Sequence, residues 1–168
     1  MIRVVVDDLA FVSADAVVRP ATAALEPVSP SHRRLEQVGG QAFWQQLKVQ
    51  QELAVGAAVV TGAGELAAEL VIHAVIRSIT EPVSSAGVRR AITSVLQRAA
   101  DWQIRRLAIP PLGVGPGGLD LEDAAEMLCG ALASHHAAGV PYPSEVDIVV
   151  ESSLERDVFE RFLRERPS

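Results

Sequence analysis

Four glycines crowd into one short stretch of this 168-residue chain, and their spacing is the strongest chemical signal in the sequence. Residues 107–123 read LAIPPLGVGPGGLDLED, which places Gly113, Gly115, Gly117 and Gly118 between a short apolar strand and a helix. Such a loop can direct backbone N–H groups and the positive end of the helix toward one anion. Glycine costs chain entropy, so four of them need a reason. Close approach to a phosphate is one explanation, and a tight structural turn is the other.

The elements around this loop narrow its chemistry. Asp120 is expected to be the N-cap of the following helix. The loop formally matches G-x-G-x-x-G, but Pro116 lacks an N–H, and Glu151, at the end of the next strand, lies well beyond the roughly 20 residues of the dinucleotide fingerprint. No Gly-Lys-Ser/Thr follows, which excludes a P-loop. The pattern therefore favours neither of these nucleotide-binding motifs.

Composition sets outer bounds on the function. The chain is 49% hydrophobic and 21% charged, as expected of one globular domain spanning residues 1–168. Its net charge of −6 argues against a duplex nucleic acid as partner. It has no run of about 18 apolar residues, so no membrane partner is expected. The start of the chain does not resemble a signal peptide, and the single cysteine, Cys129, fits a reducing compartment. A cytoplasmic location is the resulting expectation.

The hydrophobic pattern predicts an α/β fold. Apolar and β-branched runs predict strands at 2–6, 15–18, 57–60, 70–76, 107–109 and 146–150. Apolar residues at helical spacing predict helices at 31–38, at 41–53, and from about 84, 121 and 153 onward. Alternating strands and helices form a mixed sheet with helices on both faces. Ligands in such folds bind beyond the carboxyl ends of the strands, where this chain has its glycines.

Two further segments carry a resemblance to a known family. Asp8 is followed seven residues later by Asp15-Ala16-Val17-Val18, and residues 55–73 read VGAAVVTGAGELAAELVIH. Together with the glycine loop, these segments resemble three signatures of the macrodomain family, in the same order and over roughly residues 2–165. The segment from Val38 to Phe43 is similar to the macro-histone branch. The resemblance implies a single three-layer α/β/α macrodomain-like fold with a mixed central sheet.

The resemblance also implies an ADP-ribose site. Asp8 would accept a hydrogen bond from the adenine amino group, with the Leu9 backbone beside it, although Asp8 could instead merely end the first strand. The positions that would wrap the diphosphate and the distal ribose are Gly113, Val114, Gly115, Pro116, Gly117 and Gly118. Leu119 stands where the family often has an aromatic residue, so stacking on the ribose would be weaker. His73 closes a buried strand in the family and is expected to be structural.

The first ligand loop departs from the family pattern. The segment Asn-Ala-Ala-Asn of active members is replaced by Arg19-Pro20-Ala21-Thr22, so the Asn that orients the distal ribose in hydrolases becomes Thr22. The glycine run that follows is replaced by a segment containing Pro27 and Pro30, and the acidic residue of some hydrolases aligns roughly with His32. Arg19 could neutralise the diphosphate bidentately, or it could fill the cleft and block it.

These departures favour a binding module for ADP-ribose or a related adenine nucleotide over an enzyme. The expected site contains no catalytic residue, no metal and no cofactor, and the expected partner is a small nucleotide or an ADP-ribosylated protein. Two alternatives remain. One is an ADP-ribosyl hydrolase with a non-standard site, and the other is a scaffold that has lost nucleotide binding and serves protein interaction.

Overall fold

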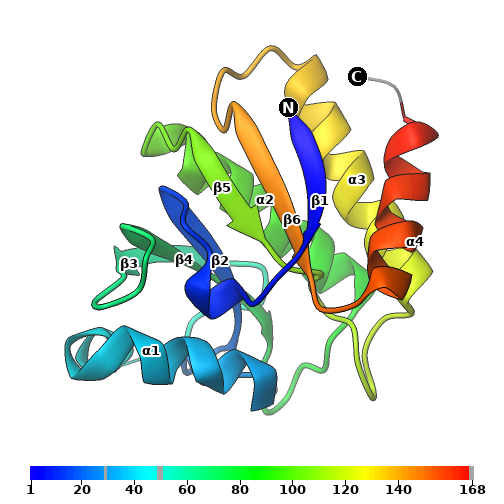
Figure 1. Ribbon diagram of the computed structural model, residues 1–168. Coiled ribbons are helices and arrows are strands. Elements are labelled where there is room, and N and C mark those ends of the chain that lie inside the picture. The colour runs from blue at the N-terminus through cyan, green and yellow to red at the C-terminus, as the bar shows by residue number, and fades with distance from the viewer. Residues whose placement is uncertain (29, 49–50, 167–168) are drawn as a thin grey trace.

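A six-stranded mixed sheet forms the centre of the computed structural model, which describes residues 1–28, 30–48 and 51–166. Its strands lie in the order β1 (Ile2–Val6), β6 (Glu145–Val150), β5 (Arg106–Ile109), β2 (Ala16–Thr22), β4 (Leu70–Arg77) and β3 (Ala58–Gly62). Neighbouring strands are parallel except for β3, which runs antiparallel to β4 (Figure 1). The predicted α/β class with a mixed sheet is confirmed.

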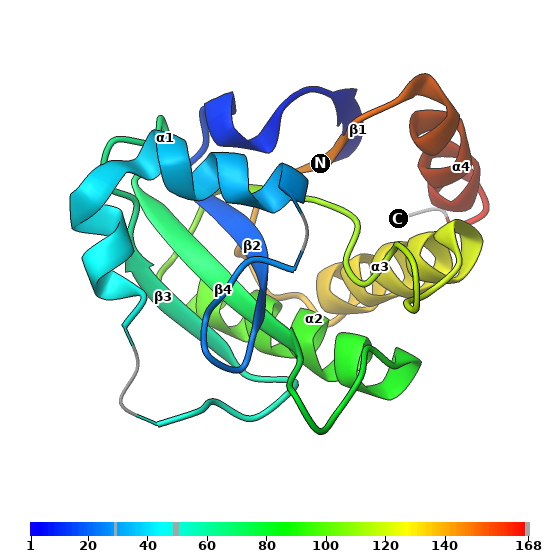
Figure 2. The ribbon, with the colours of Figure 1, turned by 90° about the horizontal axis from the view of Figure 1, so that it is seen from below.

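Helices cover both faces of the sheet and complete the expected three layers. The helices α2 (Ser85–Asp101), α3 (Leu121–Ala137) and α4 (Ser153–Arg164) pack on one face. On the other face lie α1 (Pro30–Gln46) and the short 3-10 helix η1 (Leu9–Phe11), as Figure 2 shows from below. Within the described residues, none of these helices is long and apolar enough to span a membrane.

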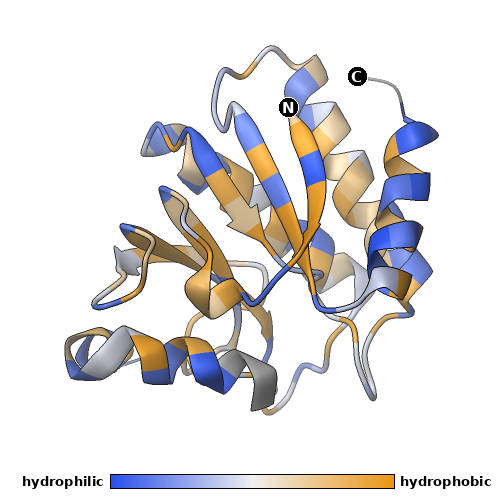
Figure 3. Ribbon diagram, viewed as in Figure 1, coloured by the Kyte–Doolittle hydropathy of each residue, from blue (hydrophilic) through white to orange (hydrophobic). Residues whose placement is uncertain are grey.

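Successive side chains of the central strands point to opposite faces of the sheet, so each face has its own hydrophobic core. In β2, Val18 packs toward α2 and α3, whereas Val17 packs toward α1. In β4, Ile72 and Val71 divide in the same way, so both faces of the strand are buried. Figure 3 shows the strands as largely hydrophobic and α4 with hydrophilic turns on its surface. The near-continuous apolar run of β4 is therefore the mark of a strand covered on both sides.

The largest differences from the predicted bounds occur at one strand and one helix. Pro20 does not stop β2, which continues to Thr22. The reason lies in the assembled sheet. Because β5 pairs with β2 only at Ala16 and Val17, Pro20 has a strand neighbour on one side only, and a missing N–H is tolerated at such an edge-like position. The expected break between two helices occurs inside α1 at Gly40 (φ 80°), but the second helix ends at Gln46 instead of residue 53. Residues 49–50 of that prediction lie outside the described residues.

Helix caps follow the sequence at two of three positions. Ser84 accepts a hydrogen bond from the Gly87 N–H, and Ser152 accepts one from the Glu155 N–H, so both serines cap the helices that follow them. Asp120 occupies the N-cap position of α3, but its side chain makes no capping hydrogen bond. The start of α3 is therefore held by packing and by its own backbone bonds.

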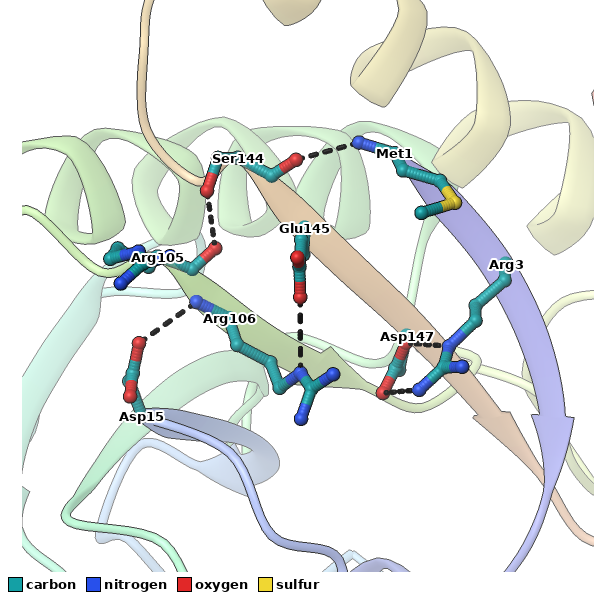
Figure 4. A network of polar contacts seen from close by, with 8 residues as sticks. All are labelled: Met1, Arg3, Asp15, Arg105, Arg106, Ser144, Glu145 and Asp147. Atoms are coloured by element: carbon teal, nitrogen blue, oxygen red, sulfur yellow. Dashed lines mark hydrogen bonds and ion pairs between the residues drawn. The ribbon is translucent and has the colours of Figure 1, made fainter.

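A polar network links four strands toward their amino ends (Figure 4). Arg3 Nε lies 2.6 Å from Asp147 Oδ1, and Arg106 Nε lies 3.3 Å from Glu145 Oε2. These residues alternate with neighbours that face α2–α4, so they occupy the sheet face on the side of α1, in a part that α1 does not cover (Figure 1). The charged pairs therefore provide cross-strand contacts at the edge opposite the glycine loop.

Candidate functional site

The glycine loop lies between two cavities at the carboxyl edge of the parallel strands. The first, the Asp8 cavity, has a volume of about 230 Å³, and its lining includes Asp8, Leu9, Leu35, Pro110, Pro111 and Val114. The second, the Thr22 cavity, has a volume of about 500 Å³, and its lining includes Thr22, Glu26, Glu52, Arg77, Pro116 and Gly117. Consecutive parts of one loop thus border both cavities. The arrangement suits a ligand that places one bulky group in each cavity and joins them by a linker that crosses the loop.

The glycines of the loop divide between the two explanations that the sequence left open. A side chain at Gly118 would overlap the Gly113 carbonyl oxygen, and the loop is closed by a 2.7 Å hydrogen bond from the Leu119 N–H to that oxygen. Gly118 therefore serves the tight turn. Gly117 has φ +77°, and a Cβ atom there would meet no atom of the described residues within 4 Å. Gly117 therefore leaves bare backbone toward the Thr22 cavity, as a backbone anion site requires.

The N-terminus of α3 contributes less than the sequence suggested. No described residue of α3 lines either cavity. In its first turn, Glu122 accepts a 2.8 Å hydrogen bond from Arg161 of α4. Of the loop residues that line a cavity, Val114 and Gly117 carry an N–H, whereas Pro116 does not. The candidate anion site is consequently the loop itself.

Asp8 both lines its cavity and ends the first strand. Its Oδ1 accepts a 3.0 Å hydrogen bond from the Ala10 N–H and so caps η1, while Leu9 lies beside it in the cavity wall. Its Oδ2 accepts a 2.5 Å hydrogen bond from Arg34 Nη1. The Asp8 side chain is 33% exposed, so a ligand can reach the carboxylate.

Arg19 does not lie beside the cleft, and the expectation that it would bind or block a diphosphate is wrong. Its side chain is fully buried beneath α1, where it forms an ion pair with Glu36 and donates 2.8 Å to the Leu25 carbonyl oxygen. Burial lowers the pKa of Arg19, and the nearby Glu36 charge opposes that shift. The strand alternation explains the placement, since Arg19 faces the same side of β2 as Val17.

His73 takes part in the same buried network. Arginine has only donors, so the 3.2 Å contact from Arg19 Nη1 makes His73 Nδ1 an acceptor. The Nε2–H then donates to Thr61 Oγ1 at 2.8 Å, which describes a neutral imidazole. Burial, assisted by the Arg19 charge, lowers the pKa of His73 to about 3. The environment of His73 is that of a structural residue.

Thr22 keeps its predicted place, but its hydroxyl is engaged in a turn. Thr22 Oγ1 accepts a 3.1 Å hydrogen bond from the Glu26 N–H, and the Thr22 N–H donates 2.9 Å to the Glu26 carbonyl oxygen. This turn, residues 22–26, forms one wall of the Thr22 cavity. Ser29 and the side chains of residues 30–32, including His32, lie outside the described structure.

Two arginines at the cleft were missed in the sequence. Arg34 contacts Asp8, and Arg77 ends β4 in register with Thr22, exposed in the wall of the Thr22 cavity. The signals were present, as a basic pair near the start of α1 and a charge directly after the apolar run 70–76, but neither matches a motif. Within the described ranges, no three His, Cys, Asp or Glu residues gather as a metal site.

Cys129 is a packing residue. It is buried between the sheet and α4, where its Sγ lies 3.9 Å from the Phe159 carbonyl oxygen. Burial raises the pKa of its thiol to about 11, against a smaller opposing effect of Arg166. Such a thiol stays protonated and unreactive at neutral pH.

Comparisons with known proteins agree with this architecture. The family model described as Macro domain matches residues 32–128. An uncharacterized protein of Mycobacterium tuberculosis is 29% identical over 128 residues, which make up 76% of this chain and 36% of that protein. The chain thus spans about a third of the length of the curated relatives that it matches first.

Two solved structures have the same fold and were determined with nucleotides. The Oceanobacillus iheyensis macrodomain with ADP has a TM-score of 0.80 and 15% identity, covering 96% of this chain and 89% of that chain. The Trypanosoma brucei macrodomain in complex with ADP-ribose has a TM-score of 0.84 and 16% identity, covering 95% and 68%. The signatures, the sheet order and the matched family model lead to one conclusion: the chain belongs to the Macro domain family.

Proposed function

We propose that this chain binds ADP-ribose or a related adenine nucleotide across the Asp8 and Thr22 cavities, without turning it over. The observation that carries the proposal is the position of the glycine loop, which borders both cavities and leaves bare backbone at Gly117. A diphosphate that joins two nucleoside-sized groups would cross this loop. Membership of the family and the nucleotide complexes of its structural neighbours support the same ligand class.

The Asp8 cavity suits the adenine end of such a ligand. Its walls are largely apolar, from Leu35, Pro110 and Pro111, and a purine ring can pack against them. The Asp8 carboxylate accepts hydrogen bonds and has no donor when ionised, so it favours an exocyclic amine over a keto oxygen. The exocyclic amine of adenine therefore suits this wall.

The Thr22 cavity suits the distal end. Arg77, and not Arg19, supplies a guanidinium near the loop, and a guanidinium pairs well with phosphate oxygens. The carboxylates of Glu26 and Glu52 in the same wall can accept hydrogen bonds from ribose hydroxyl groups. This end therefore combines one cation with two acceptors, which matches a sugar attached to a phosphate.

A hydrolase is the second candidate, and one observation favours it. Glu26 and Glu52 place carboxylates at the end of the cleft where a distal ribose would lie. Hydrolysis also needs a water held in geometry against the anomeric carbon, and the Thr22 hydroxyl is already engaged with the Glu26 N–H. Release of ADP-ribose from a modified protein by catalytic amounts of the chain would establish this alternative.

Calorimetric titration with ADP-ribose tests the proposal. We expect micromolar affinity, a binding free energy of about −8 kcal/mol, for the wild type. Gly117→Ala places a methyl group in the cleft, so we expect it to weaken binding about tenfold, or about 1.4 kcal/mol. Gly139→Ala is the matched control: Gly139 has φ +76° with equally open surroundings, but lies after α3, near the amino edge of the sheet.

The control separates backbone strain from ligand contact. Both substitutions place an L-residue in the left-handed region and cost about 1 kcal/mol of stability. Only Gly117→Ala should change the affinity. A wild type that binds no ADP-ribose would reject the proposal in favour of the scaffold alternative, and equal affinities for both variants would remove the glycine loop from the site.

A further inference from the structure

A third cavity adjoins the Thr22 cavity across the turn at residues 22–26. This Trp44 cavity has a volume of about 430 Å³ and is lined by apolar parts of Leu25, Pro27 and Leu47, together with Trp44. It shares Ala24 and Glu26 with the Thr22 cavity. The two cavities are thus separated by a single turn of the chain.

Trp44 has the properties of an anchor for a partner. Trp44 is 50% exposed, and its Nε1–H donates a 2.7 Å hydrogen bond to the Glu36 carbonyl oxygen. That bond fixes the indole to α1 before any partner arrives. A rigid, half-exposed aromatic side chain loses little entropy on binding, and for this reason such residues often dominate interfaces.

The rim of the cavity is polar and of mixed charge. Glu26 stands on the shared wall, and Lys48 with Gln41 and Gln45 lies along α1 and directly after it. Carboxylate and amide groups around an apolar centre can satisfy the N–H and C=O groups of an extended peptide while its side chain packs inside. This composition fits a peptide better than an isolated small apolar ligand.

We propose that the Trp44 cavity binds the peptide beside the modified residue of an ADP-ribosylated protein. The inference rests on the proposed function, because the distal ribose in the Thr22 cavity carries the link to the protein. The Trp44 cavity lies across the shared wall of Ala24 and Glu26, so a peptide that crosses this turn would place an apolar side chain on the indole and a basic one near Glu26. The Asp8 and Thr22 cavities would then bind the nucleotide, and the Trp44 cavity would bind the protein segment beside it.

The test uses three probes and two tryptophan variants. The probes are free ADP-ribose, a nine-residue peptide ADP-ribosylated on a central serine with leucine and lysine flanks, and the same modified peptide with glycine flanks. The variants are Trp44→Ala and the control Trp102→Ala. Trp102 is the other tryptophan of the chain, is 55% exposed, and follows α2 at the opposite edge of the sheet.

We expect the wild type to bind the leucine–lysine peptide about tenfold more tightly than free ADP-ribose, a gain of about 1.4 kcal/mol. Trp44→Ala should lose this gain and keep the affinity for free ADP-ribose, whereas Trp102→Ala should keep both. Equal affinity of the wild type for all three probes, or an unchanged gain in Trp44→Ala, would overturn the inference. If none of the probes binds, the proposed function itself fails, so the two failures are distinguishable.

Fluorescence provides a second readout that leaves Trp44 intact. In Trp102→Phe, Trp44 is the only tryptophan. The modified leucine–lysine peptide should shift its emission to shorter wavelength, because binding removes water from the indole, and free ADP-ribose should produce no such shift. The same response to both ligands would contradict a peptide contact at Trp44.

Discussion

The Asp8 carboxylate has a structural role, and in the proposed function it would also recognise the ligand. One oxygen caps η1 through the Ala10 N–H, and the other accepts from Arg34. The Asp8–Arg34 pair is partly exposed on both sides, so its contribution to stability is small, about 0–1 kcal/mol. In the proposed complex the pair would matter more for binding, since the adenine amine would compete with Arg34 for the same Asp8 oxygen.

Asp8→Asn isolates the charge of this residue from its capping role. The asparagine carbonyl can still accept from the Ala10 N–H, but the amide offers donors to an amine that needs an acceptor. We expect ADP-ribose affinity to fall about tenfold, or about 1.4 kcal/mol, by calorimetry. Arg34→Ala is the control, and it should bind at least as tightly as the wild type. An unchanged affinity in Asp8→Asn would show that Asp8 only ends the strand.

At the scale of elements, the buried Arg19–Glu36 pair attaches α1 to the sheet. Arg19 belongs to β2, Glu36 to α1, and the same arginine holds the turn after β2 through the Leu25 carbonyl oxygen. Arg19 Nε is buried without a hydrogen-bond partner among the described residues. The charge of Arg19 therefore depends strongly on Glu36 for compensation.

Glu36→Ala should therefore destabilise the fold severely. It leaves a buried guanidinium without its counter-charge, and we expect a loss of about 3–5 kcal/mol in the free energy of unfolding. Urea denaturation measures this loss. Glu145→Ala is the control, since its pair with Arg106 is almost half exposed on both sides and should cost about 1 kcal/mol or less. Similar losses for the two variants would show that the buried pair does not anchor α1.

The same elements show what the sequence can and cannot reveal. The order of strands and helices follows from hydrophobic period and turn residues, which act locally. The continuation of β2 through Pro20 depends on how far β5 extends alongside it, which is a property of the assembled sheet. Arg19 was misplaced for a related reason: its charge suggested the cleft, whereas strand alternation and a Glu36 seventeen residues away put it in the core.

The candidate site was predictable where it consists of backbone. Asp8 and Gly117 lie in the cavity walls, and Val114 and Pro116 of the same loop lie there too, whereas Gly113, Gly115 and Gly118 line neither cavity. Arg34, Arg77 and Trp44 are placed by the packing of separate elements and have no motif of their own. Their roles become visible only when the cavities are known.

At the scale of the whole molecule, the stabilising polar contacts lie apart from the cavities of the proposed binding site. Cross-strand ion pairs lie toward the amino ends of the strands, the cavities of the cleft lie at the carboxyl edge, and a neutral histidine network lies in the core beneath α1. Acid should act first on that network. His73 cannot gain a proton without placing a second donor against Arg19 Nη1.

The free energy of unfolding should therefore fall below neutral pH. The His73 pKa is about 3 in the folded chain and 6.5 as an ordinary value, so the unfolded state binds the proton first. Stability from this difference is complete above pH 6.5 and is lost progressively toward pH 3, by about 2 kcal/mol at pH 5. Urea denaturation of wild type and His73→Gln at pH 7 and pH 5 should show the gap between them narrowing in acid. If the unfolding free energies of the two proteins fell equally between pH 7 and pH 5, His73 would not be the cause of the acid sensitivity.

The turn at residues 22–26 makes the cleft and the Trp44 cavity neighbours through one wall, in which Ala24 and Glu26 belong to both. Any movement of this wall that enlarges one cavity must reshape the other. Any linkage between the proposed nucleotide and the proposed peptide would be reciprocal: the factor by which the nucleotide changes the affinity for the peptide would equal the factor by which the peptide changes the affinity for the nucleotide. If both ligands bind as proposed, this five-residue turn would be the element through which such a linkage acts.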